Sequence, residues 1–91
     1  MWYVYFLRCS DNSIYTGITT NLERRVNRHN QGNGCDYTSR RRPVKLVYYE
    51  KYPEKTLAAK RERYLKGLSR TKKEALMVVG SLRPDFHQAS G

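Results

Sequence analysis

The run WYVYFL at positions 2–7 limits the possible folds more than any other part of this sequence. An unbroken series of aromatic and β-branched residues is typical of a β-strand. Because alternate residues of a strand point to opposite faces, both faces of this strand carry apolar or aromatic side chains. We therefore predict a central strand covered on both sides, with one face formed by Trp2, Val4 and Phe6 and the other by Tyr3, Tyr5 and Leu7.

The rest of the chain alternates between strand and helix patterns. A cluster of turn residues at 9–13 separates the first strand from a second one, so the two form a hairpin. Capping boxes of the form Thr-x-x-Glu open helices at Thr20 and Thr71, and Gly32 and Gly80 are the expected ends of these helices. The predicted elements are strands over 2–7, 14–18 and 44–52 and helices over 20–31, 54–68 and 71–79, with a loop over 32–43.

This order of elements, β-β-α-β-α-α, predicts an α+β fold with a small, mostly antiparallel three-stranded sheet flanked by helices. A chain of 91 residues is expected to form one domain. We place this domain at residues 1–80 and expect residues 81–91 to form a flexible tail. The second helix is expected to bury an apolar stripe made of Leu57, Tyr64, Leu65 and Leu68.

The charge of the chain indicates a polyanionic partner. Eighteen basic and eight acidic residues give a net charge of +10, and such a field favours nucleic acid. No apolar run approaches the roughly 20 residues that cross a bilayer, and no targeting segment is recognisable, so we expect a cytoplasmic protein without a membrane partner. Cys9 and Cys35 are compatible with one disulfide but are expected to be free thiols in a reducing compartment. The few cysteines and histidines provide no convincing set of zinc ligands.

Four short features, in order along the chain, resemble the GIY-YIG nuclease domain. They are YVY at 3–5, YTG at 15–17, Arg25 and His29 on the following helix, and the Arg-Glu pair at 61–62 on a later helix. The resemblance covers residues 2–80, and the segment DYTSRRRPVKLVYYE resembles the small stand-alone members of this family. Tyr3 and Val4 replace the glycine and isoleucine that give the family its name, and Thr16 replaces a second isoleucine, whereas both motif tyrosines and Gly17 match.

This resemblance implies a metal-dependent endonuclease that hydrolyses phosphodiester bonds by attack of water. In the family, the two motif tyrosines line the active site and one helps to deprotonate the water, while a single glutamate holds the metal. Mg²⁺ (or Mn²⁺) is therefore expected at Glu62, and Arg25 is expected to bind the scissile phosphate. The expected catalytic residues are Tyr5, Tyr15, Arg25, His29 and Glu62.

Each of these residues also has an ordinary structural interpretation. Strand tyrosines are usually half-buried packing residues, and a lone helix histidine, which could hydrogen-bond the water, a tyrosine or the phosphate, is more often structural. Glu62 can pair with Lys66 one turn later. A phenol with a pKa near 10 is a poor base at pH 7. A cationic surrounding, which lowers the phenol pKa, or a metal-bound water, which loses its proton more easily, would narrow this gap. Arg25 borders the apolar face of its helix, and Arg24 and Arg28 are placed elsewhere around it.

Nucleic acid contacts are predicted in the arginine-rich loop. Arg40, Arg41 and Arg42, together with Lys45, are expected to neutralise backbone phosphates, so that binding weakens as salt rises. Gly17 is expected either to let a phosphate approach the backbone closely or to mark a bulge or strand end. Stacking on bases and packing in the core are both open for Tyr37, Tyr48, Tyr49 and Tyr64.

DNA is the expected partner, with branched or single-stranded forms among the candidate substrates and DNA repair as the expected process. The protein is expected to act as a monomer, and a protein partner for target choice remains open. The alternative function is a non-catalytic nucleic-acid-binding module with the same fold.

One family feature has no match, an asparagine near the end of the domain, where this chain reads GSLRPDF. Either catalysis is weaker here or another residue substitutes.

Overall fold

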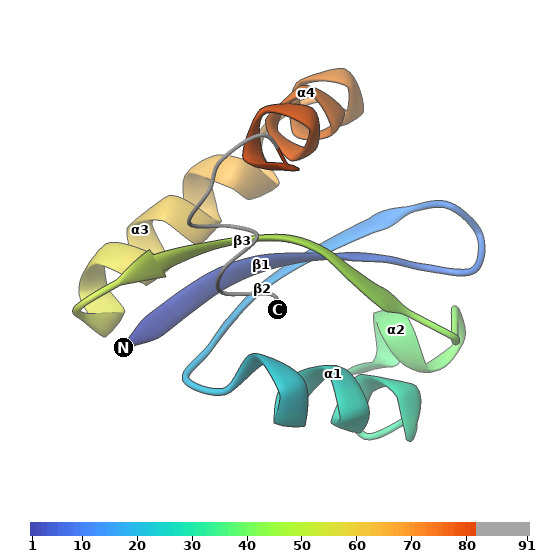
Figure 1. Ribbon diagram of the computed structural model, residues 1–91. Helices are drawn as coiled ribbons and strands as arrows, with labels where there is room; N and C mark the ends of the chain where they lie inside the picture. The colour runs from blue at the N-terminus through green and yellow to red at the C-terminus, as the bar shows by residue number, and fades with distance from the viewer. Residues whose placement is uncertain (82–91) are drawn as a thin grey trace.

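A computed structural model describes residues 1–81 of the chain. Its elements follow one another as β1 (Trp2–Arg8), β2 (Ile14–Thr19), α1 (Leu22–Asn30), α2 (Asp36–Ser39), β3 (Lys45–Tyr52), α3 (Lys55–Lys66) and α4 (Arg70–Ser81) (Figure 1). The predicted α+β class and the order of the long elements are confirmed, and the short helix α2 lies in the segment predicted to be a loop. The predicted tail and the GSLRPDF segment lie outside the described residues, apart from the last two residues of α4. Within residues 1–81, no helix has the length and apolar character to cross a bilayer.

Strand β1 is the central strand of an antiparallel sheet with the order β2-β1-β3, as the apolar run predicts. Its hairpin with β2 closes through a hydrogen bond from the Cys9 N–H to the Ser13 carbonyl oxygen, at 2.9 Å. Within this turn Asn12 has a φ of 71°, in the left-handed region that asparagine tolerates better than most residues. On the other side of β1, a register shift between Phe6 and Leu7 marks an irregularity in the pairing with β3.

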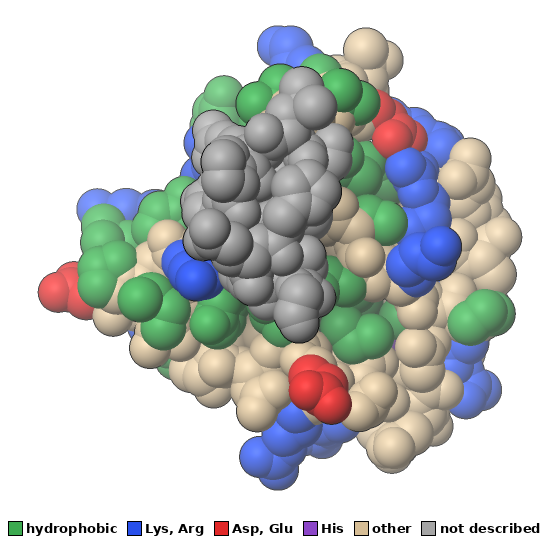
Figure 2. Space-filling model, in the orientation of Figure 1, with side chains coloured by type: hydrophobic (Ala, Val, Ile, Leu, Met, Phe, Trp, Pro, Cys, Tyr) green, Lys and Arg blue, Asp and Glu red, His purple; other side chains and the backbone are tan. Residues whose placement is uncertain are grey.

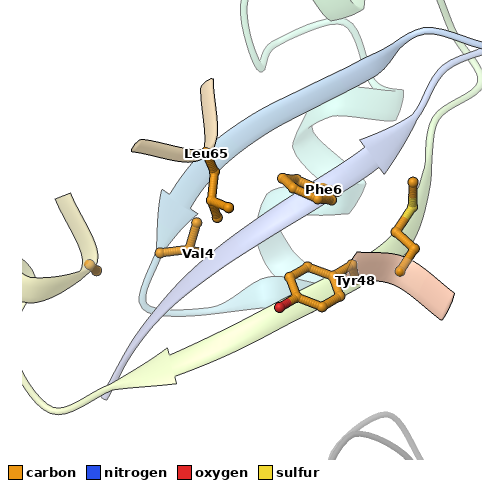
Figure 3. Packing of buried hydrophobic residues seen from close by; sticks show 6 residues of the cluster. Val4, Phe6, Tyr48 and Leu65 are labelled. Atoms are coloured by element: carbon orange, nitrogen blue, oxygen red, sulfur yellow. The ribbon is translucent and has the colours of Figure 1, made fainter. Parts of the chain in front are cut away.

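Helices cover both faces of the sheet, with α3 and α4 on one side and α1 and α2 on the other (Figure 1). On the α3 face, Val4 and Phe6 of β1 pack with Tyr48 of β3 and Leu65 of α3 (Figure 3). Because alternate residues leave a strand on opposite sides, β1 supplies one row of side chains to each half of the core. The buried apolar side chains on the α1 face are Tyr5, Leu7, Cys9, Val44 and Tyr49.

Helix α1 begins one residue later than the capping box predicts. Asn21, not Thr20, is the N-cap: its backbone is extended, and its side-chain oxygen accepts the N–H of Arg24 at 3.0 Å. The Thr19 hydroxyl in turn accepts the N–H of Asn21 at 3.1 Å. Asparagine is a slightly better N-cap than threonine, and the bond from Thr19 holds it in place. The predicted stop is confirmed by Gly32, whose φ of 86° favours glycine.

Helix α3 buries a narrower stripe than its sequence predicts. Ala58 and Leu65 are fully buried, whereas Leu57 and Tyr64 are 42% and 58% exposed. Residues seven positions apart lie on nearly the same side of a helix. The side of α3 that carries Ala58 and Leu65 packs on the sheet, and the adjacent side that carries Leu57 and Tyr64 faces away from the core.

Helix α4 is longer at both ends than its pattern predicts. Ser69, rather than Thr71, provides the hydroxyl that accepts the N–H of Lys72, at 3.2 Å, and the helix continues through Gly80. A glycine costs a helix only about 1 kcal/mol relative to alanine. Burying a methionine contributes about 1.5–3 kcal/mol, so the packing of Met77 in the core outweighs that cost.

Candidate active site

Tyr5 of β1 and Tyr15 of β2 lie diagonally across the hairpin on the same face of the sheet. The register pairs Tyr5 with Gly17 and Tyr15 with Leu7, so the two tyrosines are offset by two residues. Their ring centroids are 6.4 Å apart. Tyr5 is 1% exposed and Tyr15 is half-buried. Strand pairing thus brings the two phenol rings together on the face covered by α1.

Gly17 leaves room for Tyr5 against β2. A Cβ atom at this position would lie 2.6 Å from the Tyr5 hydroxyl oxygen and 3.1 Å from Cε2 of Tyr15. Gly17 is buried and regularly paired within β2, so the bulge or strand end expected here is absent. The structure shows that this glycine makes space for a side chain of the site, and the close approach of a phosphate stays a prediction.

His29 of α1 is buried beside the two tyrosines and is hydrogen-bonded through both ring nitrogens. It is 1% exposed, and its Nε2 lies 3.1 Å from the Tyr5 hydroxyl oxygen. Its Nδ1 lies 2.7 Å from the hydroxyl oxygen of Thr38 in α2. The imidazole centroid is 5.2 Å from that of Tyr15. Of the three partners left open for this histidine, the structure shows the tyrosine.

The segment after α1 adds three residues that sequence reasoning misses. Thr38 is fully buried, with its Oγ1 at 3.4 Å from the Sγ of Cys35, and the same thiol hydrogen-bonds the Tyr15 side chain. A Cβ at Gly34 would lie 2.0 Å from Nδ1 of His29, so the backbone packs directly on the imidazole. No periodic pattern marks these positions. The available signal is the pair of closely spaced glycines before Cys35, which indicates close backbone packing.

Arg25 and Glu62 act electrostatically on the same two tyrosines. Burial raises the pKa of Tyr5 far above its usual value and that of Tyr15 to about 12. The negative charge of Glu62 raises both pKa values further, and the positive charge of Arg25 lowers them by less than burial raises them. The predicted cationic surrounding is therefore present, but it does not bring either phenol pKa down, because desolvation of the phenolate is the larger effect.

His29 responds to the same surroundings in the opposite direction. Burial, followed by the charges of Arg25 and Arg28, lowers the pKa of its imidazole below the usual value of 6.5. An imidazole with a lowered pKa is neutral at pH 7. The ring therefore has one nitrogen that carries a proton and one that accepts a hydrogen bond.

Glu62 lies on α3, the helix that packs on β1 and on the edge strand β2. Its side chain is 22% exposed and forms an ion pair with Lys66 at 3.4 Å. The ordinary interpretation of Glu62 as a partner of Lys66 is thus confirmed. Its charge also reaches Tyr5 and Tyr15, so the same carboxylate belongs to the surroundings of the tyrosines.

The arginine beside Glu62 has a structural partner. Arg61 donates to both carboxylate oxygens of Glu50 in β3, at 2.9 and 3.0 Å. The hydroxyl groups of Tyr48 and Tyr52 donate to the same carboxylate. This two-point ion pair holds α3 on β3, and it therefore also orients the helix that carries Glu62.

Arg24, Arg25 and Arg28 line a single cleft beside the start of α1. The cleft has a volume of about 240 Å³, and its other walls are formed by Thr19, Thr20 and Asn21. Arg24 and Arg28 are exposed, whereas Arg25 is partly buried beside the apolar face, and the long side chains of all three reach the same hollow. Within residues 1–81, none of these three arginines forms an ion pair.

The predicted nucleic acid contacts separate into two groups. Arg41 forms an ion pair with Asp11 at 2.9 Å, and Arg42 donates to two backbone carbonyl groups. These two side chains hold their own loop in place. Arg40 and Lys45 are exposed and have no acidic partner in the described part of the chain, so they are the members of the set that are free to meet a phosphate.

The four tyrosines left open between stacking and packing also separate. Tyr48 and Tyr49 are 3% and 6% exposed and belong to the core. Tyr64 lies on the outer side of α3. Tyr37 is 38% exposed, and its ring centroid lies 5.9 Å from that of Tyr15. Stacking on a base therefore remains a prediction for Tyr37 in particular.

A three-stranded antiparallel sheet that brings hairpin tyrosines, a helix arginine and histidine, and a later glutamate together defines a domain of the GIY-YIG type. The family described as the GIY-YIG catalytic domain matches residues 1–75. The chain belongs to this family. Membership indicates a nuclease, and hence a nucleic acid substrate.

The relatives of this chain are small proteins of similar length. It is 47% identical to a UPF0213 protein of Clostridium perfringens over 97% of this chain and 95% of the relative, and 52% identical to one of Natronomonas pharaonis over 84% and 89%. The solution NMR structure of a UPF0213 protein from Bacillus halodurans has a TM-score of 0.58 at 44% identity, covering 90% of this chain and 89% of that one. These names state no activity.

Proposed function

We propose that this protein is a metal-dependent endonuclease that acts as a monomer and hydrolyses phosphodiester bonds in DNA by direct attack of water. The observation that carries the proposal is that Tyr5, Tyr15 and His29 pack together in a strongly basic protein. The charges of Arg25 and Glu62 act on the two tyrosines. Membership of a family of catalytic domains supports it.

Arg25 is the residue that binds the scissile phosphate. Its guanidinium carries a permanent charge and a planar fork of donors that matches phosphate oxygens. It lines the arginine cleft, and its charge reaches both tyrosines. A phosphate bound by this guanidinium would have the negative charge that grows in the transition state stabilised by the arginine.

The tyrosines position the attacking water and pass on its proton. Their raised pKa values keep both phenols protonated at pH 7, so neither is a preformed phenolate. A proton that leaves the water needs a further acceptor. The neutral imidazole of His29, hydrogen-bonded to Tyr5 at 3.1 Å, provides one.

Glu62 is the residue that would hold Mg²⁺ or Mn²⁺. Within residues 1–81, no group of three or more His, Cys, Asp and Glu side chains is placed to hold a metal. A single, partly exposed carboxylate does fit Mg²⁺, which keeps several waters and is usually bound through one or two carboxylates and substrate phosphates. When bound, the ion would supply positive charge to the phosphate and lower the pKa of a coordinated water.

The DNA backbone is held by basic side chains near this site. On the face shown in Figure 2, lysine and arginine side chains lie at several separate places, with apolar and polar side chains between them. The cleft of Arg24, Arg25 and Arg28 gathers three basic side chains at the start of α1, and the charge of Arg25 reaches both tyrosines. Arg40 and Lys45 extend the contact to neighbouring phosphates.

The test is a cleavage assay with a matched pair of glutamate variants. The purified full chain is incubated with branched, single-stranded and duplex DNA, and with RNA, in Mg²⁺ or Mn²⁺, and the products are separated by size. We expect wild type and Glu54→Gln, an exposed control at the start of α3, to cut DNA, and Glu62→Gln to lose cleavage while still binding. The proposal fails if no substrate is cut, or if Glu62→Gln cuts as well as wild type.

One observation favours a second candidate, a non-catalytic nucleic-acid-binding module. Burial raises the pKa of both tyrosines, which lowers the fraction of phenolate that is available to act as a base at pH 7. This candidate predicts binding that weakens with salt, is unchanged in Glu62→Gln, and is accompanied by no cleavage under any condition of the assay.

A further inference from the structure

We infer that Thr38 is a positioning residue that holds His29 in the tautomer with its proton on Nδ1, so that Nε2 accepts the proton of the Tyr5 hydroxyl. The hydrogen-bond arrangement stands on the structure alone. Its consequence for catalysis rests on the proposed function.

Three hydrogen bonds, two of them buried and the third partly buried, connect these residues in a chain. The Tyr5 hydroxyl oxygen lies 3.1 Å from Nε2 of His29, Nδ1 lies 2.7 Å from Oγ1 of Thr38, and Oγ1 lies 3.3 Å from the carbonyl oxygen of Cys35. Tyr5, His29 and Thr38 are each no more than 1% exposed. The backbone at Gly34 packs on the imidazole, where a Cβ would lie 2.0 Å from Nδ1. The ring is thus held in place, and its partners are protein groups.

Counting the polar hydrogens decides between the two tautomers. With the proton on Nδ1, Tyr5 donates to Nε2, Nδ1–H donates to Thr38, and Thr38 donates to the Cys35 carbonyl oxygen. That carbonyl also accepts the N–H of Ser39 at 3.0 Å, and its two lone pairs accommodate both donors. With the proton on Nε2, the imidazole donates to the Tyr5 oxygen, and the phenol proton has no acceptor among the residues described. A buried donor without an acceptor is costly, so the first arrangement is favoured.

This tautomer gives the water proton a complete path. As the water oxygen forms its bond to phosphorus, one water proton moves to the Tyr5 oxygen and the proton of Tyr5 moves to Nε2 of His29. The bond from phosphorus to the leaving oxygen breaks, and that oxygen keeps the electron pair and takes a proton from solvent. Tyr5 ends neutral and His29 ends as imidazolium. With Nε2 already protonated, Tyr5 has no group to which it can pass its proton.

The groups that face His29 determine when it is ready to accept that proton. They are Tyr5 from β1, Tyr15 from β2, Arg25 and Arg28 from α1, and Thr38 with Cys35 from the α2 segment. Burial first, and then the charges of the two arginines, disfavour imidazolium and keep the resting ring neutral. Their effect is offset only when a negative phosphate and transition state lie beside them.

The test compares Thr38→Ser, which keeps the hydroxyl, with Thr38→Val, which has nearly the same shape without it. Both are made with His87→Gln, so that ¹⁵N NMR reports a single imidazole. We expect wild type and Thr38→Ser to show a protonated Nδ1 and a bare Nε2, and Thr38→Val to shift toward a protonated Nε2. In cleavage assays, Thr38→Val should lose on the order of 100-fold in kcat, the scale of general base catalysis. KM should be unchanged and Thr38→Ser should remain active.

The inference is overturned if wild type shows a protonated Nε2 with a bare Nδ1, or if Thr38→Val keeps both the tautomer and the kcat of wild type. If Thr38→Val does not fold, the spectra of wild type and Thr38→Ser decide. Because the NMR measurement needs no substrate, absence of nuclease activity would contradict the proposed function without deciding the tautomer, which the spectra would still confirm or refute.

Discussion

Gly17 of β2 lies directly opposite Tyr5 of β1, and the space left by its missing side chain is occupied by the Tyr5 hydroxyl group. The same phenol is hydrogen-bonded to His29. One backbone position therefore decides whether the tyrosine can reach the histidine at all. This relationship explains why a glycine stands in the middle of a strand, where it would otherwise be unfavourable.

Gly17→Ala should destabilise the fold and abolish cleavage, because its Cβ would lie 2.6 Å from the Tyr5 oxygen. Overpacking of this kind costs about 1–3 kcal/mol. Urea unfolding measures the change in the free energy of unfolding. Gly67→Ala is the matched control, since its Cβ would make only an ordinary contact, 3.5 Å from the Tyr64 carbonyl oxygen. Equal stability of the two variants would contradict the role assigned to Gly17.

Arg24→Ala and Arg28→Ala should weaken DNA binding more than removal of an equal charge elsewhere. Both side chains line the cleft of Arg25, whereas Lys60 is an exposed residue of α3 that provides a control. Each lost phosphate contact should reduce the slope of log affinity against log salt by about 1. The measurement is a salt titration of binding in the Glu62→Gln background. Identical slopes for Lys60→Ala and the cleft variants would show that only net charge matters.

His29 should make the folded state less stable as pH falls below 6.5. Burial and the charges of Arg25 and Arg28 lower its pKa when folded, so the unfolded chain binds more protons between that lowered value and 6.5. Stability therefore rises with pH through this window, by up to about 1.4 kcal/mol per pH unit, and levels off above it. His29→Gln should lack this slope in unfolding experiments. The carboxylates with lowered pKa values, Glu50 among them, titrate at more acidic pH and do not mask it.

Arg61→Met should destabilise the protein by about 1–3 kcal/mol, because the partly buried carboxylate of Glu50 would lose its charged partner. Arg63→Met on the exposed side of the same helix is the control. Burial would raise the pKa of Glu50, but hydrogen bonds from Arg61, Tyr48 and Tyr52 outweigh it and lower the pKa below 4.5. This contribution to stability is present above pH 4.5 and is lost as pH falls through the lowered pKa. Acid unfolding of Arg61→Met should therefore begin at higher pH than that of wild type, and equal midpoints for the two arginine variants would refute this account.

The sequence predicts the framework of the fold well. The double-faced run at 2–7, the turn at 9–13 and the stop at Gly32 each depend on side chains within a few residues of one another. Alternation, turn chemistry and the stop at Gly32 are local properties, and the structure has them where they are expected, whereas α4 continues through the predicted stop at Gly80. The helix starts are less accurate, because adjacent residues such as Thr20 and Asn21 can both cap a helix, and a contact from Thr19 selects one.

The candidate site is only partly predictable in this way. Tyr5, Tyr15, Arg25, His29 and Glu62 are identified from the sequence because they resemble a family pattern, not because their own spacing requires a site. Thr38, Cys35 and Gly34 have no such pattern, and their importance is visible only after the chain folds back onto α1.

By itself, the sequence determined the order of the long elements, the central position of β1 and the strong positive charge. Each of these follows from residues that are neighbours along the chain or from a simple sum. The tertiary structure alone decided that His29 is buried between Tyr5 and Thr38, that Arg24 and Arg28 share the cleft of Arg25, and that burial outweighs charge at the tyrosines. Hydrogen-bond partners and local dielectric depend on groups that are distant in sequence. They become defined only when the sheet and the helices pack together.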